Sequence, residues 1–272
     1  MAKSLPLHLK RLLVCTDGSA ASQGALNAGL WLGERSGAEV AFLKVINAAT
    51  GKAFQATEET PDSLEDLKAR ALAAGVAIEV KGRPANSPHE GILEEAKAAQ
   101  PDWIIMGRKG QTGLSRLFVG SVTARVIGHG PFSVLVVPRE VTLDFRRILV
   151  ASDGSPDSVA AWREAIAVAE RLQSEVVAVS VAVNESRQID CQLILQHLQG
   201  SAARHGVSFD SILAKGRPFE AICQAAQDER ADLVVMGTHG RTGLARLLMG
   251  SVAERVIGMV GCPVLVAKKA AE

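Results

Sequence analysis

Two glycine-rich segments carry the residues of this sequence that are best suited to chemistry. Gly107-Arg-Lys-Gly110 is followed after nine residues by Gly120-Ser121, and Gly237-Thr-His-Gly240 is followed after the same interval by Gly250-Ser251. Glycine lets the backbone approach an anion closely and adopt positive φ where needed. A helix that begins at either Gly-Ser pair would direct unpaired N–H groups toward a phosphate, and the serine hydroxyl could donate one more hydrogen bond. We therefore expect both segments to bind phosphate groups.

Two better-known phosphate motifs do not fit these segments. No Gly-Lys-Ser/Thr follows at the spacing of a P-loop, and no G-x-G-x-x-G follows the first expected strand. A plainer alternative is that the glycines only form turns, or that one segment binds a ligand while the other only folds. The same spacing in two diverged segments favours a shared binding function.

The two segments belong to two copies of one sequence. Arg11–Ser19 recurs as Arg147–Ser155, 136 residues later, and Asp102–Gly107 recurs in similar form as Asp232–Gly237. A third pair of matching segments has the sequence Lys-Gly-Arg-Pro, at 81–84 and 215–218, and we expect both to form strand-to-helix turns. A period this long indicates two domains rather than a solenoid. The expected bounds are 1–140 and 145–272, with a short polar connection between them.

Each copy alternates apolar runs with helix-like segments. The pattern predicts βαβ units and a parallel sheet whose strands are apolar on both sides because helices cover both faces. The strands expected in the first copy are Leu12–Cys15, Glu39–Ile46, Val76–Lys81, Trp103–Met106 and Val134–Val137, with helices at Ala20–Arg35, Pro61–Ala74, Ser87–Ala99 and Ser121–Gly128. In the second copy the expected strands are Arg147–Ser152, Glu175–Val183, Ser208–Lys215, Leu233–Met236 and Val264–Ala267.

Ligands of such sheets bind outside the carboxyl ends of the strands, where the strand order reverses. The first strand of each copy ends at Asp17 or Asp153, within an Asp-Gly-Ser turn, and Ser19 is a candidate N-cap for the helix that follows. The fourth strand ends at Gly107 or Gly237. We therefore expect the aspartate and the glycine segment of each copy to meet at one crevice.

These motifs together resemble a tandem universal stress protein of the ATP-binding type. The resemblance covers essentially the whole chain twice, and its strongest marks are Val14–Ser19, Val150–Ser155 and the two G-x2-G-x9-G-S segments. It implies an α/β fold of two tandem Rossmann-like domains, similar to the adenine nucleotide alpha hydrolases. Each domain would hold a five-stranded parallel sheet in the order 3-2-1-4-5 with helices on both faces.

The resemblance also implies which residues would bind ATP, ADP or AMP. Asp17 and Asp153 would contact the ribose or adenine, although either could instead cap a helix. Val45 and Val181 would contact adenine, although either could equally be sheet core. The residues implied around the ribose and phosphates are Gly107, Arg108, Gly110, Gly120, Ser121, Val122 and Thr123 in the first copy and Gly237, Thr238, Gly240, Gly250, Ser251, Val252 and Ala253 in the second.

The two copies differ at one of these positions. Ala253 lacks the hydroxyl of Thr123, which places one phosphate contact of the second copy in doubt. Mg²⁺ could bridge the phosphates, but neither loop holds a carboxylate pair that would bind the metal from the protein side. His239 stands where the first copy has Lys109, and we expect it to face solvent rather than phosphate.

Composition excludes several classes of protein. The net charge of +1 argues against a polybasic protein of nucleic acids or membrane surfaces, and 4% aromatic residues leave little material for stacking on bases. No apolar run approaches the roughly 20 residues that span a bilayer. The four cysteines are scattered and the first residues do not form a secretion signal, so we expect a cytoplasmic location.

The function expected from the sequence is a nucleotide-binding stress regulator that changes its conformation or its protein partner. No Ser-His-Asp, Cys-His or carboxylate pair recurs in both copies, so an enzyme is less expected. A slow ATPase or nucleotide-transfer enzyme is the alternative, although Thr16–Ser19 lacks the loop shape of the PP-loop enzymes. A second alternative is a scaffold that binds no nucleotide. The resemblance further implies pairing of Val134–Val137 with Val264–Ala267 as a dimer within the chain, and a homodimer of chains.

Overall fold

The computed structural model describes residues 9–52, 64–108, 119–240 and 249–269. The chain separates into two compact units, His8–Val141 and a second unit that begins at Thr142. The domain bounds expected from the sequence, 1–140 and 145–272, stay a prediction that limited proteolysis can test. Within the described residues, no helix is long and apolar enough to cross a membrane.

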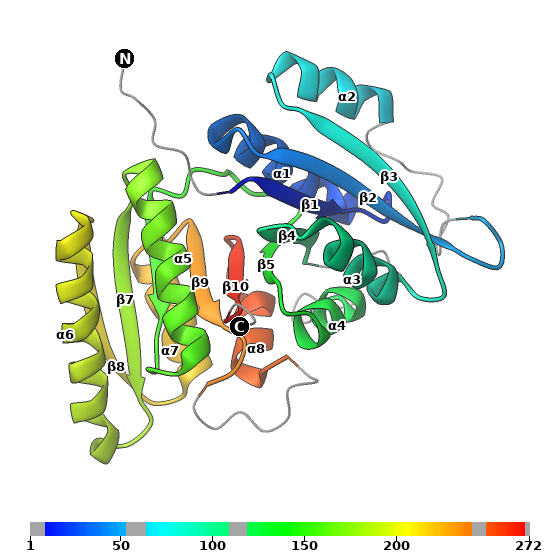
Figure 1. The fold of residues 1–272 in the computed structure, drawn as a ribbon. Helices are drawn as coiled ribbons and strands as arrows, with labels where there is room; N and C mark the ends of the chain where they lie inside the picture. The colour runs from blue at the N-terminus through cyan, green and yellow to red at the C-terminus, as the bar shows by residue number, and fades with distance from the viewer. Residues whose placement is uncertain (1–8, 53–63, 109–118, 241–248, 270–272) are drawn as a thin grey trace. The chain divides into compact units, whose positions relative to one another are not determined.

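The first unit is a five-stranded parallel sheet with the strand order β3-β2-β1-β4-β5 (Figure 1). Its strands are β1 (Arg11–Cys15), β2 (Glu39–Asn47), β3 (Ile78–Ala85), β4 (Trp103–Gly107) and β5 (Ser133–Val137). Its helices are α1 (Gln23–Ser36), α2 (Leu64–Ala73), α3 (Pro88–Ala99) and α4 (Ser121–His129), and a 3-10 turn, Ala20–Ser22, precedes α1.

Two glycines show that helices cover both faces of this sheet. A Cβ on Gly29 of α1 would lie 2.4 Å from Val14 Cγ2, and a Cβ on Gly91 of α3 would lie 2.6 Å from Val45 Cγ1. Val14 pairs with Phe42 in the register of β1 and β2, so Val14 and Val45 point to opposite faces because side chains alternate along a strand. Helices α1 and α3 therefore pack on opposite sides, as expected for a doubly covered parallel sheet.

The second unit repeats this arrangement with the order β8-β7-β6-β9-β10. Its strands are β6 (Arg147–Ala151), β7 (Glu175–Ala182), β8 (Phe209–Lys215), β9 (Leu233–Gly237) and β10 (Val264–Ala267). Its helices are α5 (Pro156–Leu172), α6 (Gln188–His205), α7 (Pro218–Asp228) and α8 (Ser251–Met259), and a 3-10 turn, Glu185–Arg187, precedes α6. Each unit thus has the strand order expected from the sequence.

The central strands of both sheets form the cores. Leu13 and Val14 of β1 and Leu149 and Val150 of β6 are fully buried, although successive side chains face opposite sides of the sheet. Burial on both faces explains why these strands are continuous apolar runs rather than alternating ones. A rigid, apolar sheet of this kind holds the polar residues that follow each strand in fixed positions at its edge.

The two Lys-Gly-Arg-Pro segments are not structurally equivalent, and the prediction of a turn is wrong for the first. Residues 81–84 lie inside β3, whereas Lys215 ends β8 and Pro218 begins α7. In the first unit, Lys81 Nζ and Arg83 Nη1 lie 3.0 and 2.7 Å from the carboxylate oxygens of the buried Glu95 on α3. This ion pairing occupies one side of β3, and in the second unit Gly216 adopts φ 108° and ends the strand.

Candidate ligand-binding cavity

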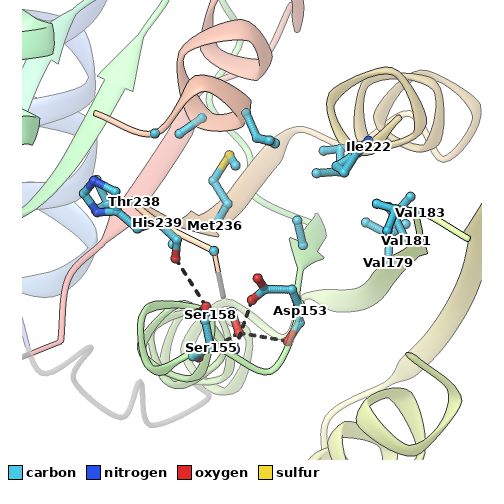
Figure 2. A pocket seen from close by; sticks show the side chains of 18 of the residues that line it. Asp153, Ser155, Ser158, Val179, Val181, Val183, Ile222, Met236, Thr238 and His239 are labelled. Carbon is cyan, nitrogen blue, oxygen red and sulfur yellow. Dashed lines mark hydrogen bonds between the residues drawn. The ribbon is translucent and has the colours of Figure 1, made fainter. Parts of the chain in front are cut away.

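A cavity of about 510 Å³ opens at the carboxyl ends of β6, β7 and β9 in the second unit (Figure 2). This volume lies within the usual range for small-molecule sites. In Figure 2, Val179, Val181, Val183 and Ile222 gather on one side, and Thr238 and His239 lie on the other. The cavity is lined by Ala151, Ser152, Asp153, Ser155, Ser158, Val179, Val181, Val183, Arg187, Asp190, Cys191, Ile194, Pro218, Ile222, Met236, Gly237, Thr238, His239, Gly240, Met249, Gly250, Ser251, Val252 and Ala253.

The apolar side of the cavity comes from alternate residues along β7 and just after it. Val179, Val181 and Val183 share one face of the strand because the side-chain period is two. Ile194 of α6 and Ile222 of α7 add further aliphatic surface to the cavity. This side could cover the faces of a flat, weakly polar group such as a nucleobase.

A tight turn after β6 places a carboxylate in the cavity. Gly154 has φ 76°, and this left-handed conformation brings the Ser155 N–H to Asp153 Oδ1 at 3.0 Å. The Ser155 hydroxyl accepts a hydrogen bond from the Ser158 N–H at 3.3 Å, so Ser155 caps α5 while Asp153 remains half-buried at the cavity wall. Asp153 itself is therefore not the N-cap residue of that helix.

The glycines of the loop after β9 permit close approach rather than unusual backbone angles. A Cβ on Gly237 would lie 2.7 Å from the Asp157 carbonyl carbon, and one on Gly250 would lie 2.3 Å from the Thr238 carbonyl oxygen. A Cβ on Gly240 would lie 2.7 Å from Asp153 Oδ2. None of these three glycines has positive φ. The expectation that they might need it is not met here, and their lack of a side chain is what the packing requires.

Helix α8 begins at the cavity without a side-chain cap. Its N-cap is Gly250, which has no side chain to accept from the first-turn N–H groups. Ser251 is exposed and lines the cavity together with Val252 and Ala253. The N-terminal end of a helix carries partial positive charge, so this wall suits an anionic group.

All nine residues expected at the site in the second copy line this one cavity: Asp153, Val181, Gly237, Thr238, Gly240, Gly250, Ser251, Val252 and Ala253. The expectation that His239 faces solvent is wrong, since it lines the cavity and its side chain is only 20% exposed. Four further residues line the cavity and could not be predicted, because the segment that holds them has no recognisable match in the first copy: Arg187, Asp190, Cys191 and Ile194. The alternation of Val179, Val181 and Val183 could have predicted the apolar side.

The first unit repeats the aspartate turn with a different hydrogen-bond pattern. Gly18 has φ 82°, and Asp17 Oδ1 accepts from both the Ser19 N–H at 3.0 Å and the Ser19 hydroxyl at 2.6 Å. Ser19 was expected to cap the helix, but its hydroxyl donates to Asp17 and makes no side-chain cap contact. Helix α1 starts only at Gln23, after the 3-10 turn.

Two other residues expected at the first site make internal contacts. Val45 is 9% exposed and packs beneath Gly91 of α3, as a core residue would. The Thr123 hydroxyl donates to the Gly107 carbonyl at 3.0 Å, so its proton is directed to the backbone rather than to a phosphate. The difference between Thr123 and Ala253 therefore does not by itself remove a phosphate donor from the second unit.

The remaining described residues of the first site lie at the two ends of the segment that joins β4 to α4. The Gly120 N–H donates to the Arg108 carbonyl at 2.8 Å, and the Arg108 N–H donates to the Val137 carbonyl at 3.0 Å. Ser121 and Val122 begin α4, and Ser121 is exposed. Gly110 lies outside the described residues.

Comparison with known proteins gives a consistent result. The universal stress protein family model matches the chain twice, over residues 8–138 and 144–268. The chain belongs to the universal stress protein family. A family member from Methanocaldococcus jannaschii is 36% identical over 141 residues, which cover 46% of this chain and 83% of that protein. One from Synechocystis is 25% identical over 289 residues, which cover 94% of this chain and 99% of that protein.

Solved structures show the same fold over both units of the universal stress protein chain. The crystal structure of a universal stress protein from Archaeoglobus fulgidus aligns with a TM-score of 0.76 at 22% identity. The alignment covers 96% of this chain and 99% of that one. The tandem organisation expected from the internal repeat is therefore confirmed.

Proposed function

We propose that the second unit binds an adenine nucleotide, ATP or its relatives ADP and AMP, in the cavity described above. The observation that supports this best is that an apolar wall, a carboxylate and a helix N-terminus line the same cavity. The valines of β7 would hold the base, Asp153 would accept hydrogen bonds from the ribose hydroxyls, and the uncapped start of α8 would meet the phosphates. The resemblance of the glycine segments to the ATP-binding signature points to the same ligand.

The polar groups that would hold the phosphates come from the backbone and from hydroxyls. Gly237, Gly240 and Gly250 expose backbone to the cavity, and Ser251 adds a hydroxyl. Among the described residues, no group of three His, Cys, Asp or Glu side chains is placed to hold a metal ion. Mg²⁺ bound with ATP would then be carried by the phosphates.

The role we propose is regulatory, in a stress response, with nucleotide-dependent changes in conformation and in an unidentified protein partner. The cavity supports this because the elements that line it include helix α6, the loop after β9 and the start of α8. A ligand that contacts all three would fix their relative positions, and a partner that recognises that arrangement would bind the loaded form more tightly.

Calorimetric titration of the whole chain with ATP, ADP, AMP and GTP tests the proposal. We expect ATP to bind, and Asp153→Asn to weaken binding by about tenfold or more, because hydrogen bonds to charged groups contribute about 1.5–3 kcal/mol. The substitution keeps an oxygen that can accept from the Ser155 N–H, so the turn should remain folded. Absence of binding by every adenine nucleotide at millimolar concentration would overturn the proposal.

Phosphate release measured on the same samples separates a regulator from an enzyme. We expect turnover far below the roughly 10 per second typical of enzymes. A rate in that range that falls in Asp153→Asn would instead support the ATPase alternative.

A further inference from the structure

Hydrogen bonds of His239 join the loop Gly237–Gly240 to the start of α5. The His239 N–H donates to Asp157 Oδ2 at 3.2 Å. The His239 carbonyl accepts from the Ser155 hydroxyl at 3.3 Å (Figure 2). Both backbone polar groups of His239 are thus bound by residues at the beginning of α5. The close approach of Gly237 to the Asp157 backbone adds a packing contact at the same place.

The side chains of His239 and Asp157 are also close enough to form an ion pair. His239 Nδ1 lies 3.8 Å from Asp157 Oδ2, and the two side chains are 20% and 21% exposed. This attraction exists only when the imidazole is protonated, because a neutral ring carries no charge. Asp157 therefore contacts the loop through two interactions, of which only one depends on pH.

The other described charged groups around this pair come from neighbouring elements. Asp153 follows β6, and its Oδ2 lies against Gly240. Lys268 follows β10; burial is the main cause that lowers its pKa, and the negative charge of Asp157 opposes that effect. Arg187 and Asp190 line the cavity from the 3-10 turn and α6, and they pair with each other at 2.8 Å.

The two copies of the sequence differ at this pair. Asp157 is replaced by Ala21 in the first copy, and His239 is replaced by Lys109. The first copy therefore has a permanent cation with no acid at the matching position, whereas the second has a titratable cation with an acid. The chain thus supplies both control substitutions for an experiment.

We propose that Asp157 is a positioning residue for the nucleotide phosphates in the second unit, and that its pairing with His239 makes ATP binding there tighter at acidic pH. This inference rests on the proposed nucleotide site. Protonated His239 strengthens the attachment of the loop to α5 and adds positive charge beside the phosphates, so both effects have the same sign. Affinity should therefore be higher at acidic pH than at alkaline pH.

The test measures ATP dissociation constants of the full chain between pH 5.5 and 8, in a background that carries Asp17→Asn to weaken the first site. ATP loses negative charge as pH falls in every sample. The readout is therefore the ratio of the dissociation constants of the parent and of His239→Lys, whose lysine stays charged over this range. We expect the ATP affinity of the parent, relative to that of His239→Lys, to be about threefold to tenfold higher at pH 5.5 than at pH 8.

Two substitutions separate the contributions of Asp157. Asp157→Asn can still accept from the His239 N–H, and it should bind ATP at pH 8 nearly as the parent does. Its pH dependence should be smaller than that of the parent, because only the charge of His239 beside the phosphates then remains. Asp157→Ala should bind more weakly at both pH values. Parallel pH profiles of the parent and His239→Lys, or parent-like binding by Asp157→Ala, would overturn this inference alone. Failure of the parent to bind ATP at any pH would overturn the proposed function as well.

Discussion

The substitution Gly250→Ala tests whether the glycine signature is needed for folding as well as for a ligand. A Cβ at this position would lie 2.3 Å from the Thr238 carbonyl oxygen and 3.4 Å from its carbon. Both neighbours are backbone atoms, so no side chain can rotate away to relieve the contact. An ordinary contact needs about 1 Å more, and forced backbone shifts in packed regions cost about 1–3 kcal/mol.

We therefore expect Gly250→Ala to lower the free energy of unfolding by about 1–3 kcal/mol without nucleotide present. Urea unfolding followed by circular dichroism measures this as a lower midpoint with an unchanged slope. Gly261→Ala is the matched control, because a Cβ there meets nothing within 4 Å and the glycine has no positive φ. The control should change stability by less than about 0.5 kcal/mol.

The same shift should disturb the cavity, because Thr238 lines it. We expect Gly250→Ala to weaken ATP binding and Gly261→Ala to leave it unchanged. Equal urea midpoints for Gly250→Ala and the parent would refute the reasoning, since the signature glycine would then have no packing role. Loss of ATP binding without loss of stability would assign that glycine to the ligand alone.

Three further predictions concern other parts of the chain. Burial opposes ionisation of Glu95, but hydrogen bonds from Lys81 and Arg83 outweigh it and lower its pKa. Glu95→Gln should therefore destabilise the first unit by about 1–3 kcal/mol at pH 7, and the difference from the parent in urea unfolding should shrink as pH falls below about 4.3. Burial raises the pKa of the Cys15 thiol far above its usual range, so a thiol reagent at pH 8 should not label Cys15 until the protein unfolds. Whole chains should self-associate, as the resemblance implies, and a monomeric mass by light scattering would contradict this.

The parts of the fold that could be predicted are those in which local sequence decides the structure. The Asp-Gly-Ser turns were predictable because only glycine readily adopts the positive φ that Gly18 and Gly154 have. The apolar strands were predictable because burial on two faces leaves no polar positions. In the site, the residues of the loop after β9 and of the start of α8 were predictable because their spacing along the chain sets their positions.

The parts that could not be predicted depend on pairing between distant segments. The matching Lys-Gly-Arg-Pro segments differ in structure because strand register, not identity, sets equivalence: Lys81 pairs with Leu43 on β2, and Lys215 pairs with Ala182 on β7. His239 was assigned to solvent because its partner Asp157 is 82 residues away in the sequence. No local pattern reveals a contact of that kind.

The glycine signature by itself does not distinguish a binding unit from one that only folds. Gly237 and Gly250 are required by close backbone contacts that exist without any ligand, so a copy that had lost its ligand would still need them. Residues beside the loop can differ without disturbing these contacts. One example is Asp157, whose equivalent position in the first copy is Ala21. Differences in nucleotide affinity between the units should therefore follow such flanking side chains. Exchange of Asp157 and Ala21 between the copies should change the nucleotide affinity of each unit. That change should be larger than the change caused by any substitution that keeps the glycines and alters only exposed loop residues.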